Sequence, residues 1–207
     1  MPYGFLDIAM TPSVRAAQEA NGSAGHYDNS KGKRSFDAFS EDETRFIETR
    51  DSFFMASVSE SGWPYVQHRG GPPGFLRVLD ERSFGFADYR GNLQYISLGN
   101  VSVDDRVALI LMDYPHRARL KIFAHLKVHA LDEDPALTEK LIVPGYKAKV
   151  ERLMVLTLEA FDWNCPQHIT PRFTETEIAA AVAPLNQRLA ELEAENARLA
   201  GELAARS

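Results

Sequence analysis

Seven segments between Ser52 and Trp163 alternate apolar and polar residues with a period of two, and a tight turn separates several of them. That period gives a β-strand one buried face, and tight turns join antiparallel neighbours. Six or seven strands in about 110 residues predict a small antiparallel barrel, because closure removes the exposed edges of such a sheet. The expected strands are 52–59, 63–69, 75–80, 83–88, 106–113, 119–131 and 152–163.

Helical patterns surround this barrel. Ser40 and Glu43 have the spacing of a capping box, which predicts a helix over residues 41–50. The fold class is therefore mainly β, of the α+β type, with peripheral helices. The other helical patterns cover residues 11–20, 91–100 and, as two short helices, 134–150.

The C-terminal tail has a heptad period. A polar Asn at an a position favours a parallel helix pair, and Arg188 at g would face Glu193 at e of a parallel partner. We predict a C-terminal coiled-coil helix, a parallel homodimer over about 184–205, with a kink or restart at Pro184. An amphipathic helix folded back on its own domain is the alternative. The a and d residues are Ile178, Val182, Leu185, Leu189, Leu192, Asn196, Leu199 and Leu203.

These patterns divide the 207-residue chain into three parts. Residues 1–39 are expected to form an N-terminal arm with a short helix and a polar, Gly-containing connector at 21–33. Residues 40–173 form the barrel domain, and residues 174–207 form the C-terminal helix. This length suffices for one domain of ordinary size with an appendage.

Composition argues against several classes of function. A net charge of -6 disfavours a nucleic-acid partner, because neutralising phosphates needs a surplus of Lys and Arg. The one cysteine, Cys165, cannot form an intramolecular disulfide and favours a reducing compartment. No segment approaches the ~20 apolar residues that span a bilayer, and the N-terminus lacks a signal-peptide pattern. We therefore expect a cytoplasmic protein with no membrane partner.

Three polar clusters stand at the ends of predicted strands. In the first, consecutive glycines let main-chain amides approach a ligand, and an arginine can form two parallel hydrogen bonds to a phosphate. In the second, a strand gives way to a helical pattern whose free amides can seat a phosphate. In the third, aromatic and polar side chains can stack on a planar heterocycle and hydrogen bond to it. The clusters are Gln67, His68, Arg69, Gly70 and Gly71; Asp88, Arg90, Asn92 and Gln94; and Trp163, Gln167, His168 and Arg172.

Each cluster taken alone has a simpler interpretation. Turn chemistry demands the same residues, so residues 70–74 also fit a wide loop, and Arg90 also fits a turn before a helix. Cys165 and His168 have the spacing of two metal ligands, but no second pair completes a four-ligand site, so no metal is expected. Together, however, the clusters supply the parts that hold a phosphorylated, planar redox cofactor, which FMN fits best.

Four phrases of the sequence resemble, in their order, the pyridoxamine 5'-phosphate oxidase-like FMN-binding split barrel family. They resemble most closely its branch of related flavin-nucleotide-binding proteins. The resemblance covers roughly residues 40–173, whereas the Arg-x-His pattern of true pyridoxamine phosphate oxidases is not present near the C-terminus. The phrases are WPYVQHRGGPPGFLRVLD, FADYRGNLQYISLGN, DDRVALILMDYPHRARLKI and WNCPQHITPRF.

The resemblance implies a six-stranded antiparallel split β-barrel that forms a homodimer, with FMN sites at the subunit interface. It implies that His68 and Arg69 lie beside the flavin ring and ribityl chain, while Arg90, Asn92 and Gln94 hold the phosphate. Further polar contacts are implied for Arg119 and Lys121 of the same chain, and for Trp163, Gln167, His168 and Arg172 of the partner chain. With Gly70 and Asp88, these residues make up the expected cofactor site.

The functional hypothesis is an FMN-dependent oxidoreductase that passes hydride or electrons between NAD(P)H and a small-molecule substrate. FMN is favoured over FAD and deazaflavin F420, and no side chain is assigned as a catalytic acid or base. Two alternatives remain open. One is a non-catalytic flavin-binding or sensing module, and the other is a haem-handling split barrel in which His68 or His168 ligates iron.

Overall fold

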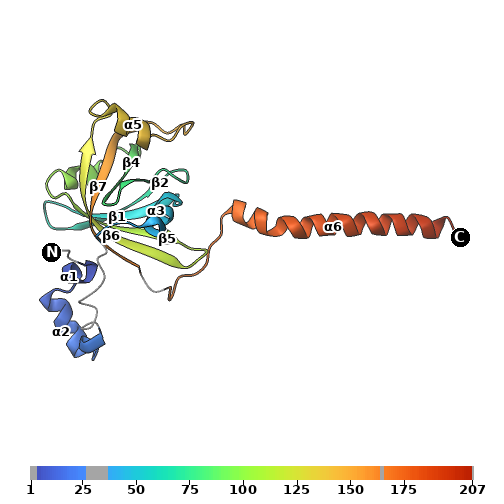
Figure 1. The fold of residues 1–207 in the computed structure, drawn as a ribbon, viewed down its shortest axis with the longest axis horizontal. Helices are drawn as coiled ribbons and strands as arrows, with labels where there is room; N and C mark the ends of the chain where they lie inside the picture. Colours follow the sequence, from blue (N-terminus) through green and yellow to red (C-terminus); the bar gives the residue numbers. More distant parts are fainter. Residues whose placement is uncertain (1–3, 27–36, 164–165, 207) are drawn as a thin grey trace. The chain divides into compact units, whose positions relative to one another are not determined.

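The computed structural model describes residues 4–26, 37–163 and 166–206, which form two compact units. The first unit comprises Met1–Asp113 with Arg117–Gln167, and the second comprises Tyr114–His116 with His168–Ser207. The first unit contains an antiparallel sheet of seven strands in the order β2-β1-β5-β6-β7-β4-β3 (Figure 1). The strands are β1 Ser52–Val58, β2 Pro64–Gly70, β3 Arg77–Asp80, β4 Ser83–Tyr89, β5 Arg106–Asp113, β6 Ala118–His129 and β7 Val150–Trp163.

All seven predicted segments form strands, but the expected six-stranded split barrel is wrong in two respects. The sheet has seven strands, and no backbone ladder joins its end strands β2 and β3 within the described chain. The chain between these strands contains Pro72 and Pro73, which lack the amide that a ladder needs. The sheet is therefore open in its hydrogen bonding.

Side chains, rather than backbone bonds, bring the two ends of the sheet together. The rings of Phe53 on β1 and Phe86 on β4 meet edge to face with centroids 5.3 Å apart, although these strands are not neighbours in the sheet. Arg69 of β2 also forms an ion pair with Asp88 of β4. The sheet consequently curls around its core, and we call the line where β2 approaches β4 the seam.

Strand β4 is buried on both faces. Phe84 and Phe86 point into the main core, while Ala87 packs with Leu141 and Leu153 in a second apolar cluster. Gly85 has no room for a side chain, since a Cβ there would lie 2.9 Å from the Met154 carbonyl oxygen. Burial on both faces explains why β4 contains no charged residue before Asp88.

Short helices flank the sheet. Helix α3, Glu41–Glu48, begins at the predicted capping box of Ser40 and Glu43. Helix α4 spans Ile96–Val101, and α5 spans Pro135–Leu141. The second helix expected within 134–150 is wrong: α5 ends at Leu141, and Pro144 precedes Gly145, whose φ of 78° suits a turn.

The N-terminal arm packs partly on the sheet. Its helices are α1 Phe5–Ala9, α2 Pro12–Ala20 and the 3-10 turn η1 Ala24–His26; α2 is capped by Thr11 as predicted. The ring of Phe5 in α1, a helix that the sequence did not predict, stacks on Phe123 of β6 with centroids 4.3 Å apart. The later part of the predicted connector, from residue 27 on, lies outside the described residues.

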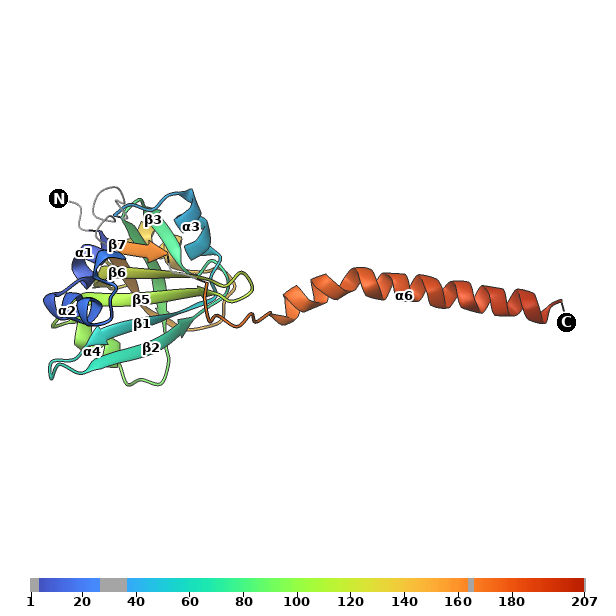
Figure 2. The same ribbon diagram turned by 90° about the horizontal axis from the view of Figure 1, so that it is seen from below.

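The second unit contains helix α6, Glu175–Ala204, whose start is fixed by a capping box of Thr174 and Glu177. The prediction for Pro184 was a kink or a restart, and the restart does not occur, because α6 runs through Pro184 as one helix (Figure 2). Its apolar a and d side chains are exposed: Leu185 is 69% exposed and Leu189 is 56% exposed. Neither α6 nor any other helix in the described ranges has an apolar stretch that could cross a bilayer.

Candidate functional site

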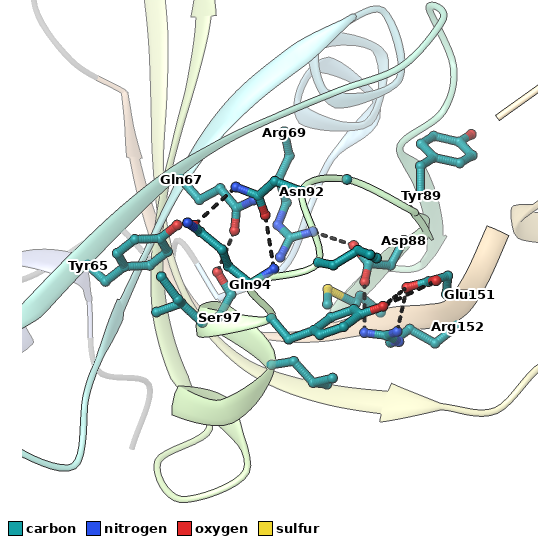
Figure 3. A pocket seen from close by; sticks show the side chains of 16 residues that line it. Tyr65, Gln67, Arg69, Asp88, Tyr89, Asn92, Gln94, Ser97, Glu151 and Arg152 are labelled. Atoms are coloured by element: carbon teal, nitrogen blue, oxygen red, sulfur yellow. Dashed lines mark hydrogen bonds and ion pairs between the residues drawn. The ribbon is translucent and has the colours of Figure 1, made fainter. Parts of the chain in front are cut away.

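A pocket of about 60 Å³ lies beside the seam (Figure 3). Its walls come from β2, from the end of β4, from the start of β7 and from the segment 91–98 that leads into α4. The polar side chains that line it are Tyr65, Gln67, Arg69, Asp88, Tyr89, Asn92, Gln94, Tyr95, Ser97, Glu151 and Arg152.

Strand β2 supplies alternate side chains to this pocket. Gln67 and Arg69 line it and are partly buried, whereas Val66 and His68 are exposed. Successive side chains of a regular strand point to opposite faces, and on β2 Arg69 lines the pocket whereas His68 does not. Instead, His68 packs edge to face on Phe54, with ring centroids 5.4 Å apart.

Five charged residues form an alternating series that we call the ion-pair chain. Four of them line the pocket, whereas the fifth, Arg90, is not a lining residue and joins the series through Glu151. Arg69 Nη1 lies 2.5 Å from Asp88 Oδ1, and Asp88 Oδ2 lies 3.4 Å from Arg152 Nη1. Arg152 Nη2 lies 2.8 Å from Glu151 Oε2, and Glu151 Oε1 lies 2.6 Å from Arg90 Nε. Three arginines face two carboxylates, so the series has one surplus positive charge.

Glu151 accepts hydrogen bonds from more than one donor. The bond from Arg90 is the main cause that holds the pKa of Glu151 below its usual value of 4.5, while burial opposes this shift. The Tyr95 hydroxyl, which donates to Oε2 at 3.0 Å, and the charge of Arg152 lower the pKa further. Glu151 is therefore ionised at neutral pH.

The segment after β4 is a loop held by side-chain hydrogen bonds rather than the start of the expected helix, because α4 begins only at Ile96. The Asn92 carboxamide accepts from the Gln94 amide at 3.1 Å and donates to the Gln94 side chain at 3.0 Å. The Ser97 hydroxyl donates to the Gln67 carboxamide oxygen at 2.9 Å, which links the loop to β2. Tyr95 has a φ of 52° and does not cap α4 with its side chain.

Three buried donors in the pocket lining have no hydrogen-bond acceptor in the described structure: Arg69 Nε, Arg152 Nη1 and the Tyr89 hydroxyl. Burial raises the pKa of Tyr89, and the charge of Tyr146 adds to that effect, so the phenol stays protonated. Leaving such donors unpaired is costly. The lining is thus suited to a ligand that brings acceptor atoms.

The glycines of the first cluster have structural roles. The Gly71 amide already donates to the Asp51 carbonyl oxygen at 2.9 Å, and a Cβ on Gly71 would lie 2.7 Å from Phe75 Cγ. Gly70 pairs with Ser52 in the β1–β2 ladder. Close packing at the end of β2 is therefore sufficient to explain these two residues.

Arg119 and Lys121 lie on β6, whose Leu120 and Ile122 point into the core. Lys121 Nζ lies 2.8 Å from Asp162 Oδ2 and 4.5 Å from the centre of the Phe5 ring. Neither Arg119 nor Lys121 lines the pocket.

Trp163 is held by α3. Its indole nitrogen donates to Glu43 Oε1 at 2.6 Å, and its ring meets Phe46 edge to face with centroids 4.7 Å apart. Burial acts to raise the pKa of Glu43, but hydrogen bonds from Ser40 and Trp163 outweigh it and lower the pKa below 4.5. Trp163 thus has a structural partner within its own chain.

The rest of the third cluster is exposed. Gln167 ends the first unit, while His168 and Arg172 belong to the second, where the Arg172 guanidinium lies 4.8 Å from the centre of the Tyr114 ring. Cys165 lies outside the described residues. Among the residues that are described, no three or more His, Cys, Asp and Glu side chains gather as metal ligands would.

Sequence reasoning did not select Glu151 and Arg152, which complete the ion-pair chain. One signal was available: Asp88 follows four residues without polar side chains, Phe84 to Ala87, near the end of a buried strand, and a buried carboxylate requires a cation. The register that pairs Asp88 with Arg152 is long-range, so the local sequence does not identify that cation.

One comparison with known proteins shows the family of the chain. The family model for pyridoxamine 5'-phosphate oxidase matches residues 39–160, a range that includes the whole pocket lining. No curated protein matches the chain.

Three solved structures are among those to which the chain is similar. HupZ from Group A Streptococcus has 12% identity and a TM-score of 0.49, with 65% of this chain and 99% of that chain covered. A proposed pyridoxamine 5'-phosphate oxidase from Lactobacillus delbrueckii has 20% identity and a TM-score of 0.47, with 61% and 94% covered. A Clostridium acetobutylicum protein related to general stress protein 26 has 14% identity and a TM-score of 0.44, with 66% and 94% covered.

Proposed function

The chain belongs to the pyridoxamine 5'-phosphate oxidase family, and from that premise we propose that it binds FMN and passes hydride or electrons through it to a small-molecule substrate. The observation that carries this proposal is the pocket at the seam, which lies wholly within the matched residues. Its lining combines two arginines and two carboxylates with buried donors that await acceptors, and Arg90, which is not a lining residue, adds a third arginine beside it.

The lining fits part of a flavin. Ring carbonyls, ring nitrogens and phosphate oxygens are all acceptors, which matches the unpaired donors of Arg69 and Tyr89 and the Arg152 Nη1 donor, whose 3.4 Å ion pair with Asp88 is not a hydrogen bond. A pocket of about 60 Å³ is far smaller than the ~300 Å³ or more of an enclosed small-molecule site. A single chain would therefore supply one wall, and a second copy would complete the site in a homodimer.

We assign the residues of this wall by their position. Gln67 and Arg69 would contact the flavin ring, and Asp88 holds Arg69 in place with an ion pair at 2.5 Å. Asn92 and Gln94 of the lining would face the phosphate, and so would Arg90, which is not a lining residue but contacts Glu151 of the lining. When bound, the flavin supplies the redox chemistry, and the residues of the chain orient it and tune its potential by their charges.

We also propose that α6 pairs with α6 of a second copy as a parallel coiled coil. The exposed leucines of α6, Leu185, Leu189 and Leu192, keep an a/d spacing that suits a helical partner. Asn196 at an a position, and Arg188 at g opposite Glu193 at e, favour a parallel partner with the same sequence.

The phosphate assignment is tested with Arg90→Ala. FMN affinity, measured by quenching of flavin fluorescence, should fall about tenfold, because a charge-assisted contact is lost. Arg45→Ala, which removes an exposed arginine of α3, is the matched control and should change nothing. Equal FMN affinity in all three proteins would remove Arg90 from the site.

The redox assignment is tested by adding NADH or NADPH without oxygen. Bleaching of the bound flavin is expected with at least one of them. A flavin that neither reduces would contradict NAD(P)H as the electron donor and would favour the flavin-binding module or a deazaflavin donor.

A further inference from the structure

We propose that Glu151 determines how much negative charge the pocket accepts, because its carboxylate already occupies the donors that a ligand's phosphate would use. The identity of the ligand rests on the function proposed above. The placement of Glu151 among its donors rests on geometry alone.

Three donors converge on this one carboxylate. Arg90 Nε lies 2.6 Å from Oε1, Arg152 Nη2 lies 2.8 Å from Oε2, and the Tyr95 hydroxyl lies 3.0 Å from Oε2. The donors come from the end of β4, from the start of β7 and from the loop before α4. Two guanidinium groups and a hydroxyl around two oxygens form the kind of site that binds a phosphate or a carboxylate. Here the chain supplies its own anion, whose side chain is only 9% exposed.

The two carboxylates of the ion-pair chain differ in how easily they can be released. Asp88 lies between Arg69 and Arg152, whose side chains are 11% and 14% exposed, so its contacts are enclosed. Arg90, in contrast, has a side chain that is 48% exposed and can turn away from Glu151. The Glu151–Arg90 contact is therefore the one that an incoming anion would replace.

The net charge of the ion-pair chain determines how strongly the pocket attracts a phosphate. The ion-pair chain has one surplus positive charge, whereas a phosphate monoester carries between 1.5 and 2 negative charges at about pH 7. A phosphate monoester at Arg90 would exchange one anion for another and would lie near the displaced Glu151 carboxylate. A phosphate at Arg90 should consequently gain less affinity in the wild type than in a variant whose residue 151 is uncharged.

Glu151→Gln tests this inference, because glutamine keeps the size of the side chain and removes its charge. FMN and riboflavin are titrated into each protein, and they differ only in the phosphate. The ratio of FMN affinity to riboflavin affinity should be about tenfold higher in E151Q than in the wild type. This is the gain expected when one unit charge near the phosphate is removed. Glu159→Gln on the same strand, where the side chain is 42% exposed, makes the same change in net charge and should alter neither ligand.

Two results would overturn the inference. An unchanged FMN-to-riboflavin ratio in E151Q would mean that Glu151 does not compete with the phosphate. Weaker FMN binding would mean that Glu151 serves as a scaffold for the arginines. Circular dichroism checks the fold of E151Q. If E151Q does not fold, Glu151→Ser is used in its place, and it should raise the FMN-to-riboflavin affinity ratio in the same way.

Inorganic phosphate separates this inference from the flavin proposal. Calorimetric titration should show phosphate binding about tenfold more tightly to E151Q than to the wild type, whether or not flavin binds. If neither flavin binds to any of the proteins but this phosphate preference is seen, the proposed function fails and the role of Glu151 stands. Equal phosphate affinity in the two proteins would contradict the role of Glu151.

Discussion

The seam and helix α6 distribute their residues in opposite ways. At the seam, Arg69 and Asp88 are charged yet have side chains only 11% and 12% exposed, whereas on α6 Leu185 and Leu203 are 69% and 70% exposed. Soluble proteins ordinarily expose their charges and bury their leucines. The first unit compensates for its buried charges with ion pairs, while the apolar stripe of α6 remains accessible to another molecule. Buried charge and exposed apolar surface thus mark the two places where we expect binding.

The largest effect should follow from breaking the ion pair at the seam. Arg69→Met leaves the Asp88 carboxylate buried with only the longer 3.4 Å contact to Arg152, and should lower the free energy of unfolding by about 3 kcal/mol. Urea denaturation measures this loss. Arg198→Met breaks an exposed pair with Glu202 on α6 and should cost about 0.5 kcal/mol or less. Similar costs for the two variants would contradict the contrast between the regions.

The next effect concerns the exposed leucines. Leu189→Asp places a charge in the proposed coiled-coil interface and should remove much of the helical signal of α6, because most of a helix's stability in a protein comes from packing of its apolar face. Far-ultraviolet circular dichroism over a range of concentrations follows this change. Gln187→Asp, at an f position away from the a and d residues of α6, is the control. If L189D and Q187D retain the same helicity, α6 folds without a partner helix.

A smaller effect tests a buried polar contact between α3 and β7. Trp163→Phe removes the indole donor to Glu43 and should lower the free energy of unfolding by about 1 kcal/mol at neutral pH. The pKa of Glu43 in the folded protein lies below 4.5, so the stabilisation is present above pH 4.5 and is lost as the pH falls through the folded value. The wild type and W163F should therefore converge in acid, whereas the exposed Trp63→Phe control should match the wild type at every pH. A difference that persists unchanged in acid would exclude Glu43 as the cause.

Much of the fold follows from local sequence patterns. The period of two located all seven strands, and the spacing of Ser40 and Glu43 located the start of α3. The errors arose where backbone chemistry or long-range packing determines the local structure. Pro144 and Gly145 favour a turn where a second helix was expected, and α1 is held in part by the contact of Phe5 with Phe123, far along the chain.

The candidate site was less accessible to sequence reasoning. The alternation of β2 could have separated His68 from Arg69, since adjacent strand residues point to opposite faces. Glu151 and Arg152 could not be selected, because their role depends on the register between β4 and β7 and on the curl that brings β2 to β4. Local sequence indicates which residues can bind anions, and tertiary pairing decides which of them meet.

The most direct test of the central claim is an absorption spectrum of the purified full chain, recorded after incubation with FMN and removal of unbound ligand. We expect the two bands of oxidised flavin, with weaker retention in Arg90→Ala than in the wild type. A haem Soret band in the purified protein, or a colourless protein that retains no FMN, would contradict the proposed function.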